Sequence, residues 1–224
     1  MTSNAATEGR PETVVAYTAR RIQTAIAEGQ YPPGTRLSPN AIATDFGVSH
    51  IPVREALASL SARGYIVHRQ AQGFFARELS SEDLADIYHM REVLEREAYI
   101  MAVSKITDED IAEMRRVLEE MGQHTSAPDR LRYLELNREF HFVAFKRAES
   151  PRLLELLNYL WDIAAPYGAA ELIDSTEGWR DHFEYLSRFE ARDAGGVIAA
   201  MAAHRQYRMR HIEQWEAKKS FPGS

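Results

Sequence analysis

The sequence predicts a mainly α-helical protein, in which an N-terminal winged helix-turn-helix with a small β-hairpin wing precedes an all-helical bundle domain. Leu37 to Leu60 has the pattern of two short helices joined by a tight turn, and two short β-prone segments follow this pair. From Ser80 onward, apolar residues recur at helical spacing and no strand pattern interrupts them. These observations together indicate the fold class.

The first helix of the pair is amphipathic. Its expected apolar face consists of Ala41, Ile42, Ala43 and Phe46. We expect Gly47 to end this helix, because glycine readily adopts the left-handed conformation that closes many helices. Val48 is then expected to pack inside the turn.

The second helix is expected to begin after Ser49, whose hydroxyl can accept hydrogen bonds from amides of the next turn. Pro52 is tolerated there, because the first amides of a helix have no partner within it. The buried stripe is expected to be Val53, Ala56, Leu57 and Leu60. This stripe turns Arg54 outward, so that His50, Ile51 and Arg54 lie where a recognition helix meets the major groove of DNA. The alternative is an ordinary helical hairpin with a solvated Arg54.

A β-hairpin is expected after this pair of helices. Its β-prone runs are Tyr65 to Val67 and Phe74 to Phe75, and the segment HRQAQG separates them. Gly73 suits the turn. Arg69 and Gln72 at the tip of this wing could reach phosphates or the minor groove, although a basic residue in a turn is often only solvated.

Composition sets the protein class. The chain has 224 residues and no cysteine, which suits one or two domains and excludes disulfides and thiolate metal sites. No apolar run approaches the roughly 18 residues of a membrane span, and residues 1–10 lack the apolar core of a signal peptide. We therefore expect a cytoplasmic protein with no membrane partner. Residues 1–79 carry a net charge of +2 within a total of −6, which orients the basic part toward phosphate.

The body of the protein is expected to be helical throughout, with breaks at SAPD, ESP and AGG. Ser80 with Asp83, and Thr107 with Asp110, resemble capping boxes that open helices. The expected helices are Ser80 to Val103, Thr107 to Gln123, Asp129 to Ala148, Pro151 to Ala170, Ser175 to Asp193 and Gly195 to Ala217. The expected organisation is a disordered tail over 1–10, a winged helix-turn-helix domain over 11–79, a helical domain over 80–217 and a tail over 218–224.

Four side chains of the body have the spacing of a metal site. Asn137 and His141 stand four residues apart and share one helix face, while His182 and His204 fall on the last two helices. Three imidazoles and an amide oxygen suit a divalent zinc, nickel, manganese or iron ion. From spacing alone, histidines in an all-helical domain are more often core or surface residues than metal ligands.

The chain resembles a known family over about Pro11 to Glu216. The segments YPPGTRLS, GVSHIPVREAL and HRQAQGFFA resemble the winged-helix domain of GntR-type bacterial transcription regulators. The segments DIYHMREVLE, NREFH, DHFEYLSRFEARD and MAAHRQYRMRHI resemble the ligand-binding domain of the FadR branch, the FCD domain, in its shorter VanR-like six-helix form.

This resemblance implies a DNA-binding transcriptional regulator that acts as a repressor. It implies a homodimer that binds a palindromic operator in double-stranded DNA, with an effector-binding and dimerisation domain that takes a small organic acid. The residues expected to contact DNA are Arg36, Ser49, His50, Ile51, Arg54, Arg69, Gln72 and Gly73. The resemblance assigns a divalent metal ion to Asn137, His141, His182 and His204, and an effector contact to Arg91.

The chain departs from the family at three positions. Asn40 and His50 stand where the family often has arginine, so the operator sequence cannot be carried over from relatives. Asn137 stands where aspartate is more usual, and its neutral oxygen is a weaker donor. We therefore expect weaker metal retention and stronger attraction for an anionic effector.

Arg91 could grip a carboxylate with two parallel hydrogen bonds, or it could pair with Glu95 one turn further along the same helix. Aromatic residues that could line the cavity, or simply form core, are Tyr88, Trp161, Tyr167 and Trp179. His68, His124 and His211 match no motif position and are expected to be surface or packing residues.

The sequence is compatible with two other functions. The body could only dimerise, or bind a ligand without a metal. More remotely, three histidines and an open coordination position could activate water in a hydrolase. No HExxH segment and no assured general base support that alternative, so we expect the protein not to be an enzyme.

Overall fold

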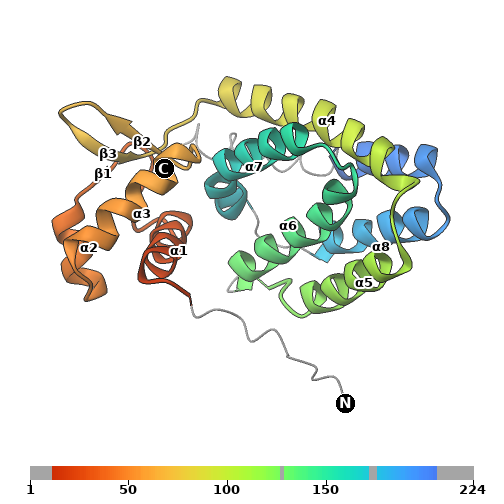
Figure 1. The fold of residues 1–224 in the computed structure, drawn as a ribbon, viewed down its shortest axis with the longest axis horizontal. Helices are drawn as coiled ribbons and strands as arrows, with labels where there is room; N and C mark the ends of the chain where they lie inside the picture. The colour runs from red at the N-terminus through yellow and green to blue at the C-terminus, as the bar shows by residue number, and fades with distance from the viewer. Residues whose placement is uncertain (1–11, 127–128, 172–175, 206–224) are drawn as a thin grey trace, which may run out of the picture.

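The computed structural model describes residues 12–126, 129–171 and 176–205. Figure 1 shows a head, made of helices α1 to α3 and a small sheet, beside a body that begins with the long helix α4. Helix α7 (Pro151–Glu171) lies between the two parts and contacts α1 (Val14–Ala27) of the head as well as helices of the body.

The helix-turn-helix consists of α2 (Pro39–Phe46) and α3 (His50–Ala62). Gly47 ends α2 with φ +67°, which confirms its expected role. Ala41 was expected in the apolar face but is exposed, and the buried residues of α2 are Ile42 and Ala43.

Ser49 precedes α3 as expected, but its side chain makes no capping hydrogen bond, so that part of the prediction was wrong. Pro52 explains the difference, because it occupies the third helical position, whose amide often donates to the capping oxygen, and proline has no N–H. By contrast, Ser38 at the start of α2 has a suitable partner: its Oγ accepts from the amide of Ala41 at 3.4 Å.

Two elements of the head were not predicted. Helix α1 begins after Thr13, whose hydroxyl accepts from the amide of Ala16 at 3.1 Å. Strand β1 (Arg36–Leu37) adds a third strand to the wing. The core of the head joins all these elements, and its fully buried members are Ile22, Ile42, Val53, Ala56, Leu57, Leu60 and Ile66.

The wing is an antiparallel sheet in the order β1-β3-β2. Strand β2 (Ile66–Arg69) pairs with β3 (Gly73–Ala76), so that Ile66 lies opposite Ala76. The strand therefore continues through His68 and Arg69, which were expected in the turn. The turn is shorter than predicted, and the backbone adopts positive φ at Ala71 (+61°) and Gly73 (+101°).

The body contains α4 (Ser81–Val103), α5 (Asp108–Gly122), α6 (Arg130–Arg147), α7, α8 (Thr176–Glu190) and a helix over 194–205. Both expected capping boxes are present. The hydroxyl of Ser80 accepts from the amide of Asp83, and the hydroxyl of Thr107 accepts from the amide of Asp110. The remainder of the last expected helix, residues 206–217, lies outside the described residues, as do both expected tails.

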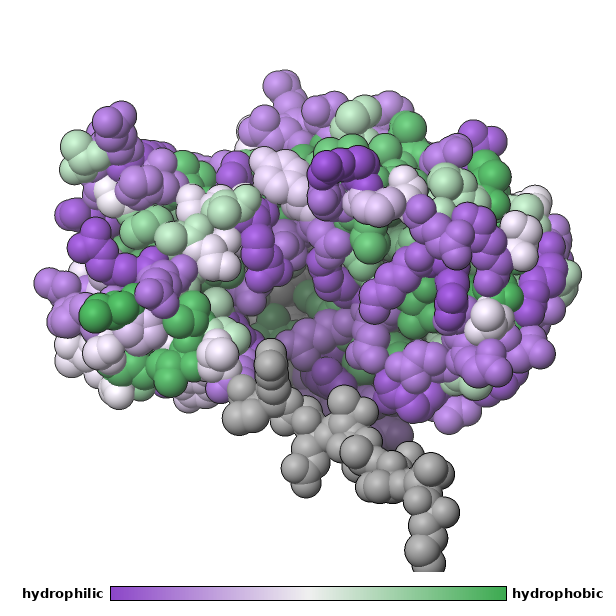
Figure 2. Space-filling model, in the orientation of Figure 1, coloured by the Kyte–Doolittle hydropathy of each residue, from purple (hydrophilic) through white to green (hydrophobic). Residues whose placement is uncertain are grey.

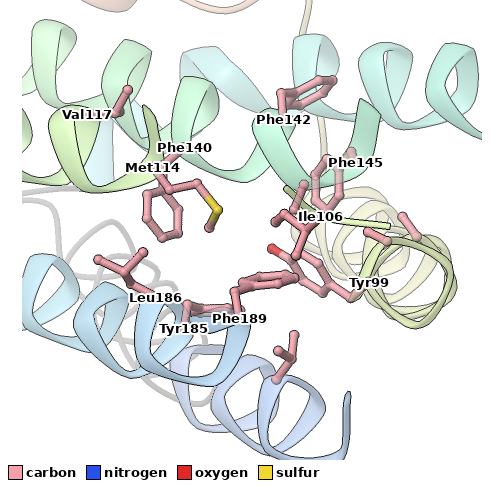
Figure 3. Close-up of a cluster of buried hydrophobic side chains, with 14 of the residues drawn as sticks. Tyr99, Ile106, Met114, Val117, Phe140, Phe142, Phe145, Tyr185, Leu186 and Phe189 are labelled. Atoms are coloured by element: carbon pink, nitrogen blue, oxygen red, sulfur yellow. The ribbon is translucent and has the colours of Figure 1, made fainter. Parts of the chain in front are cut away.

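Aromatic side chains from three helices form the centre of the body core (Figure 3). The ring of Tyr99 on α4 lies 5.0 Å from that of Phe145 on α6 and 5.7 Å from that of Phe189 on α8, between centroids. This packing brings α4, α6 and α8 together around one point. Among the residues that the structure describes, none of the helices combines the length and the apolar character that a membrane span requires.

Candidate DNA interface and histidine cluster

The outer face of α3 is the candidate DNA interface. His50, Ile51 and Arg54 are all exposed, and Ile51 has 70 % of its surface accessible. Val53 and Leu57 on the opposite face are fully buried in the head core. The amphipathic pattern therefore presents to solvent the three side chains expected to face the major groove. Ser49, at the start of the helix, is exposed as well.

The wing carries the other residues expected at DNA. Arg36 on β1 pairs with Phe75 on β3, and an added Cβ at Gly73 would lie 3.8 Å from Nε of Arg36. The guanidinium of Arg69 lies 4.5 Å from the centroid of the Phe75 ring. Gln72 is exposed in the turn. The sheet thus gathers two arginines around one aromatic residue.

Three histidines of the body converge in the interior and form what we call the histidine cluster: His141 on α6, His182 on α8 and His204 on the helix over 194–205. Their exposed fractions are 3 %, 0 % and 8 %, and each offers one ring nitrogen within 4.8 Å of the others. The Nε2 atoms of His141 and His182 lie 3.1 Å apart. Asn137 lies one turn before His141 on α6 and is also buried, with 3 % of its surface exposed.

The other ring nitrogen of each histidine has a partner of its own. Nδ1 of His182 donates to the carbonyl oxygen of Gly178 at 2.6 Å. Nδ1 of His204 lies 3.3 Å from a carboxylate oxygen of Asp181. Because a carbonyl only accepts, the neutral ring of His182 must carry its proton on Nδ1 and a lone pair on Nε2.

His141 has two ways to complete this network. The hydroxyl of Tyr99 lies 2.5 Å from Nδ1 of His141. In one arrangement Tyr99 donates to Nδ1 of His141, whose Nε2–H then donates to His182. In the other, Nδ1–H of His141 donates to Tyr99, and the two Nε2 lone pairs face each other across 3.1 Å.

The second arrangement fits a divalent metal ion. Two facing lone pairs repel unless a cation lies between them, and imidazole nitrogens are preferred ligands of zinc, nickel and iron. Metal-binding histidines usually donate their second N–H to a carboxylate, carbonyl or hydroxyl, which holds the ring in place. The partners Asp181, Gly178 and Tyr99 supply one acceptor of each kind.

A small cavity of about 40 Å³ adjoins the histidine cluster, and both His141 and His204 line it. Arg91 on α4 also lines it and is 5 % exposed. Nε of Arg91 donates to Glu95 at 3.0 Å, so the expected pairing with Glu95 is present. Arg91 makes this pair and lines the cavity at the same time. Glu95 further accepts from Nε1 of Trp161 at 2.8 Å.

Two of the four aromatic residues considered for the cavity line it, namely Tyr88 and Trp161. Tyr167 instead accepts from the amide of Leu79 at 2.6 Å, at the connection between head and body. Trp179 donates to the carbonyl of Leu118 at 2.9 Å and packs against α5. The latter two residues are therefore structural in the described contacts.

Sequence reasoning missed the partners of the histidine cluster. Tyr99 stands two turns after Arg91 on α4, and none of the motifs indicates its role. Asp181 adjoins His182 in sequence, and that neighbouring carboxylate was the signal that could have pointed to it. Gly178 contributes its backbone carbonyl, and every residue type has that group, so the sequence could not indicate this role.

An exposed recognition helix on a winged head, followed by a helical body with buried polar side chains around a cavity, defines a DNA-binding regulator with a sensor domain. A family model described as "Bacterial regulatory proteins, gntR family" matches residues 16–76, and the FCD domain model matches residues 86–207. The chain belongs to the GntR family of transcriptional regulators and carries an FCD domain.

Two curated relatives are similar over most of their length. McbR, an HTH-type transcriptional regulator of Escherichia coli K12, is 31 % identical over 180 residues, which cover 78 % of this chain and 81 % of McbR. The Nta operon transcriptional regulator of Aminobacter aminovorans is 35 % identical over 187 residues, covering 81 % and 85 % respectively. The solved structure of E. coli McbR/YncC superposes with a TM-score of 0.77 at 26 % identity, covering 90 % of this chain and 98 % of that one.

Both relatives are transcriptional regulators, and the family model that matches residues 16–76 describes regulatory proteins. The protein is therefore a regulator and not an enzyme, and the hydrolase alternative has no support.

Proposed function

We infer that this protein is a repressor, of the VanR-like group within the FadR branch, that binds a palindromic operator as a homodimer. A small carboxylate effector, bound at a divalent metal ion in the body, relieves the repression. The observation that carries this proposal is the convergence of three buried imidazoles beside a cavity that also contains a buried arginine.

The metal ligands in this proposal are the histidine cluster and Asn137. All four are neutral, so a bound ion keeps its full +2 charge, and it would supply an electrostatic anchor with open coordination positions for a carboxylate oxygen. Tyr99, Asp181 and the carbonyl of Gly178 hold the three rings with Nε2 toward the same point. The body residues thus form the site in advance, which lowers the entropy cost of binding.

Arg91 is the proposed second contact of the effector. Its buried guanidinium has five N–H donors, and Glu95 takes the donors of Nε and Nη2 on the side of Trp161. A carboxylate in the cavity would compete with Glu95 for this arginine. The volume of about 40 Å³ is enough for about three water-sized groups, so we propose an effector of few non-hydrogen atoms.

DNA recognition is proposed through α3 and the wing. Arg54, Ile51 and His50 would read base edges, while Arg36 and Arg69 would contact phosphates. Release of the operator follows if the effector-bound body holds the two heads of a dimer at a spacing that two half-sites do not allow.

The test uses the full-length protein freed of metal with a chelator. Thermal unfolding is followed with Zn²⁺, Ni²⁺ or Mn²⁺, each alone and then with acetate or malonate. We expect one of these metals to raise the melting temperature of the wild type and of His68→Ala, a head variant, but not of His182→Ala. If no metal stabilises the wild type, or if His182→Ala responds like the wild type, the metal-anchored site is refuted and a body that only dimerises or binds a metal-free ligand is favoured.

A further inference from the structure

We propose that the buried carboxylate of Asp162 couples the effector cavity to the recognition helix. This inference rests on the proposed function, because it names the route by which that site regulates DNA binding. It is carried by a group of three charged residues, Arg63, Arg138 and Asp162, that we call the Asp162 junction.

The junction joins the head to the body. Nε of Arg63 donates to Oδ2 of Asp162 at 2.8 Å, across 99 residues of sequence. Arg63 is the C-cap of α3, whose first turn carries the candidate DNA contacts. Asp162 lies on α7 and has 6 % of its surface exposed. The end of the recognition helix is therefore tied to a carboxylate that the body has removed from water.

The packing at this point is close. A Cβ added to Gly64, the residue after Arg63, would lie 2.6 Å from Cε2 of Tyr159 and 3.1 Å from Cγ1 of Ile163, both on α7. The linker between head and body is held in the same place, since Nε of Arg77 donates to the carbonyl of Gly64. A displacement of this part of α7 would therefore be transmitted to the end of α3.

Beside the junction, Figure 2 shows the surface hollowed between head and body, where a cleft of about 260 Å³ is lined by Arg63, Arg138 and Asp162.

The first connection from the junction to the cavity runs along α7. Trp161 directly precedes Asp162, and its Nε1 donates to Glu95 at 2.8 Å. The guanidinium of Arg91 lies 3.9 Å from the centroid of the Trp161 ring. An effector that draws Arg91 away from Glu95 would change both contacts of Trp161. Trp161 and Asp162 are adjacent on α7, so a shift of the α7 backbone at Trp161 would also move the carboxylate of Asp162.

The second connection runs along α6. Nη1 of Arg138 lies 3.5 Å from Oδ1 of Asp162. Arg138 directly follows Asn137 and comes three residues before His141 on α6. Nη2 of Arg138 donates to Asn158 of α7 at 2.7 Å. Burial lowers the pKa of Arg138, and the nearby charges of Arg63 and Arg91 act in the same direction, while Asp162 opposes them. Asp162 is thus the shared counter-charge of one arginine from the head and one from the metal-binding helix.

This arrangement has two features of a switch. One carboxylate divided between two arginines is sensitive to small displacements, because Coulomb interactions depend on distance and are stronger for a carboxylate that is largely removed from water. The two arginines also lie on different rigid elements, α3 and α6, whose relative position the effector is proposed to change. Asp162 is a positioning residue in this scheme and contacts neither metal nor DNA.

The experiment is a double-mutant cycle on operator affinity in the full-length protein. Glu95→Gln removes the charge that holds Arg91, and so imitates capture of Arg91 by an effector. Asp162→Asn removes the shared charge with little change in shape. Affinity is measured by fluorescence anisotropy on a duplex that the wild-type protein has selected from a random pool. Asp110→Asn serves as the control, because it breaks an ion pair with Arg147 that lies within the body.

We expect Glu95→Gln to weaken operator binding at least about fivefold in the wild-type background and in the Asp110→Asn background. In the Asp162→Asn background, we expect Glu95→Gln to weaken operator binding less than about twofold. An equal effect of Glu95→Gln in all backgrounds, or no effect in any of them, overturns the proposal. Circular dichroism checks that each variant is folded, and the conservative variant Arg63→Lys is expected to retain part of the coupling.

A calorimetric titration with Zn²⁺ separates this inference from the proposed function. Asp162→Asn is expected to bind Zn²⁺ as the wild type does, since Asp162 is not a ligand. If the wild type binds none of Zn²⁺, Ni²⁺ and Mn²⁺, the proposed metal site is refuted. The double-mutant cycle still decides the role of Asp162, because the cycle uses no metal. A loss of Zn²⁺ binding in Asp162→Asn alone would assign Asp162 to the architecture of the site and overturn its role as a coupling residue.

Discussion

Nε2 of His141 lies 3.1 Å from Nε2 of His182, although the two residues come from different helices. The carbonyl of Gly178 holds the proton of His182 on the far side of its ring, so that a lone pair faces His141. In the metal-free protein, this geometry allows Nε2–H of His141 to donate to Nε2 of His182. With both Nε2 atoms unprotonated, the same geometry suits a shared metal ion. The first two predictions concern this pair and its surroundings.

Removal of the Tyr99 hydroxyl should weaken metal binding. In Tyr99→Phe, Nδ1 of His141 loses the hydroxyl that lies 2.5 Å away, so the ring is held less firmly. We expect Zn²⁺ affinity, measured by calorimetry, to fall by about 10- to 100-fold. Tyr65→Phe, which alters a buried tyrosine of the head, should leave it unchanged. Equal affinities for wild type and Tyr99→Phe would show that Tyr99 does not orient His141.

A carboxylate at position 137 should strengthen metal binding. Asn137→Asp replaces a neutral oxygen with an anionic one, one turn before His141 on α6. We expect a lower dissociation constant for the metal, together with weaker binding of a carboxylate effector, because the net charge at the ion falls. Calorimetric titrations with metal and then with acetate measure both quantities. If neither changes, Asn137 does not contribute to the site.

Arg54 should contribute to sequence-specific DNA binding. It is exposed on α3, between the buried residues Val53 and Ala56 of the opposite face. If Arg54 donates to a guanine, Arg54→Ala weakens binding to a selected operator by about 1 to 3 kcal/mol and weakens binding to a random duplex much less. Arg152→Ala, at an exposed position of α7, is the control. Equal losses on both duplexes would make Arg54 a phosphate contact.

Glycine at position 64 should be required by close packing as well as by its backbone. Gly64 and Gly29 have φ of +78° and +79°, but an added Cβ meets Tyr159 at 2.6 Å only at Gly64, and meets nothing within 4 Å at Gly29. Gly29→Ala should therefore cost about 1 to 2 kcal/mol from backbone strain alone. Gly64→Ala should cost a further 1 to 3 kcal/mol, roughly, from overpacking. Urea denaturation measures the free energy of unfolding of both variants. Equal losses would show that Tyr159 and α7 can move away from the added methyl group at little cost.

The capping box of α5 should give a pH-dependent contribution to stability. Burial raises the pKa of Asp110, but hydrogen bonds from Arg147 and Thr107 outweigh it, so the pKa is lowered overall. A lowered folded-state pKa means that the ionised carboxylate stabilises the fold above the unfolded pKa of about 3.9. That contribution is lost as the pH falls through the folded pKa.

Asp110→Asn should accordingly lower the free energy of unfolding at pH 7 by about 1 kcal/mol, as for other caps. The difference from wild type should shrink as the pH falls below about 4, where the wild-type carboxyl becomes protonated. Urea denaturation at a series of pH values follows it. A difference that stays constant down to low pH would attribute the loss to the changed side chain and not to its charge.

Local interactions explain why so much of the fold could be predicted. Gly47 ends α2, and the capping boxes at Ser80 and Thr107 open α4 and α5, because each depends on residues within one turn of the chain. Strand β1 escaped prediction for the opposite reason: it has two residues, and it exists because Leu37 pairs with Phe74. The missing hydroxyl bond of Ser49 follows from Pro52, and it could have been foreseen from the sequence.

The sequence by itself determined the helical periodicity, the class of the head, and the residues that the family resemblance assigns to metal and effector. Tertiary structure alone decided that Tyr99 and Asp181 support the histidine cluster, that Arg91 lines the cavity beside that cluster, and that Asp162 meets Arg63. These contacts join residues that are far apart in the chain or on different helices. They depend on how helices pack against one another, and a helical repeat of 3.6 residues shows which face is buried without showing which helix covers it.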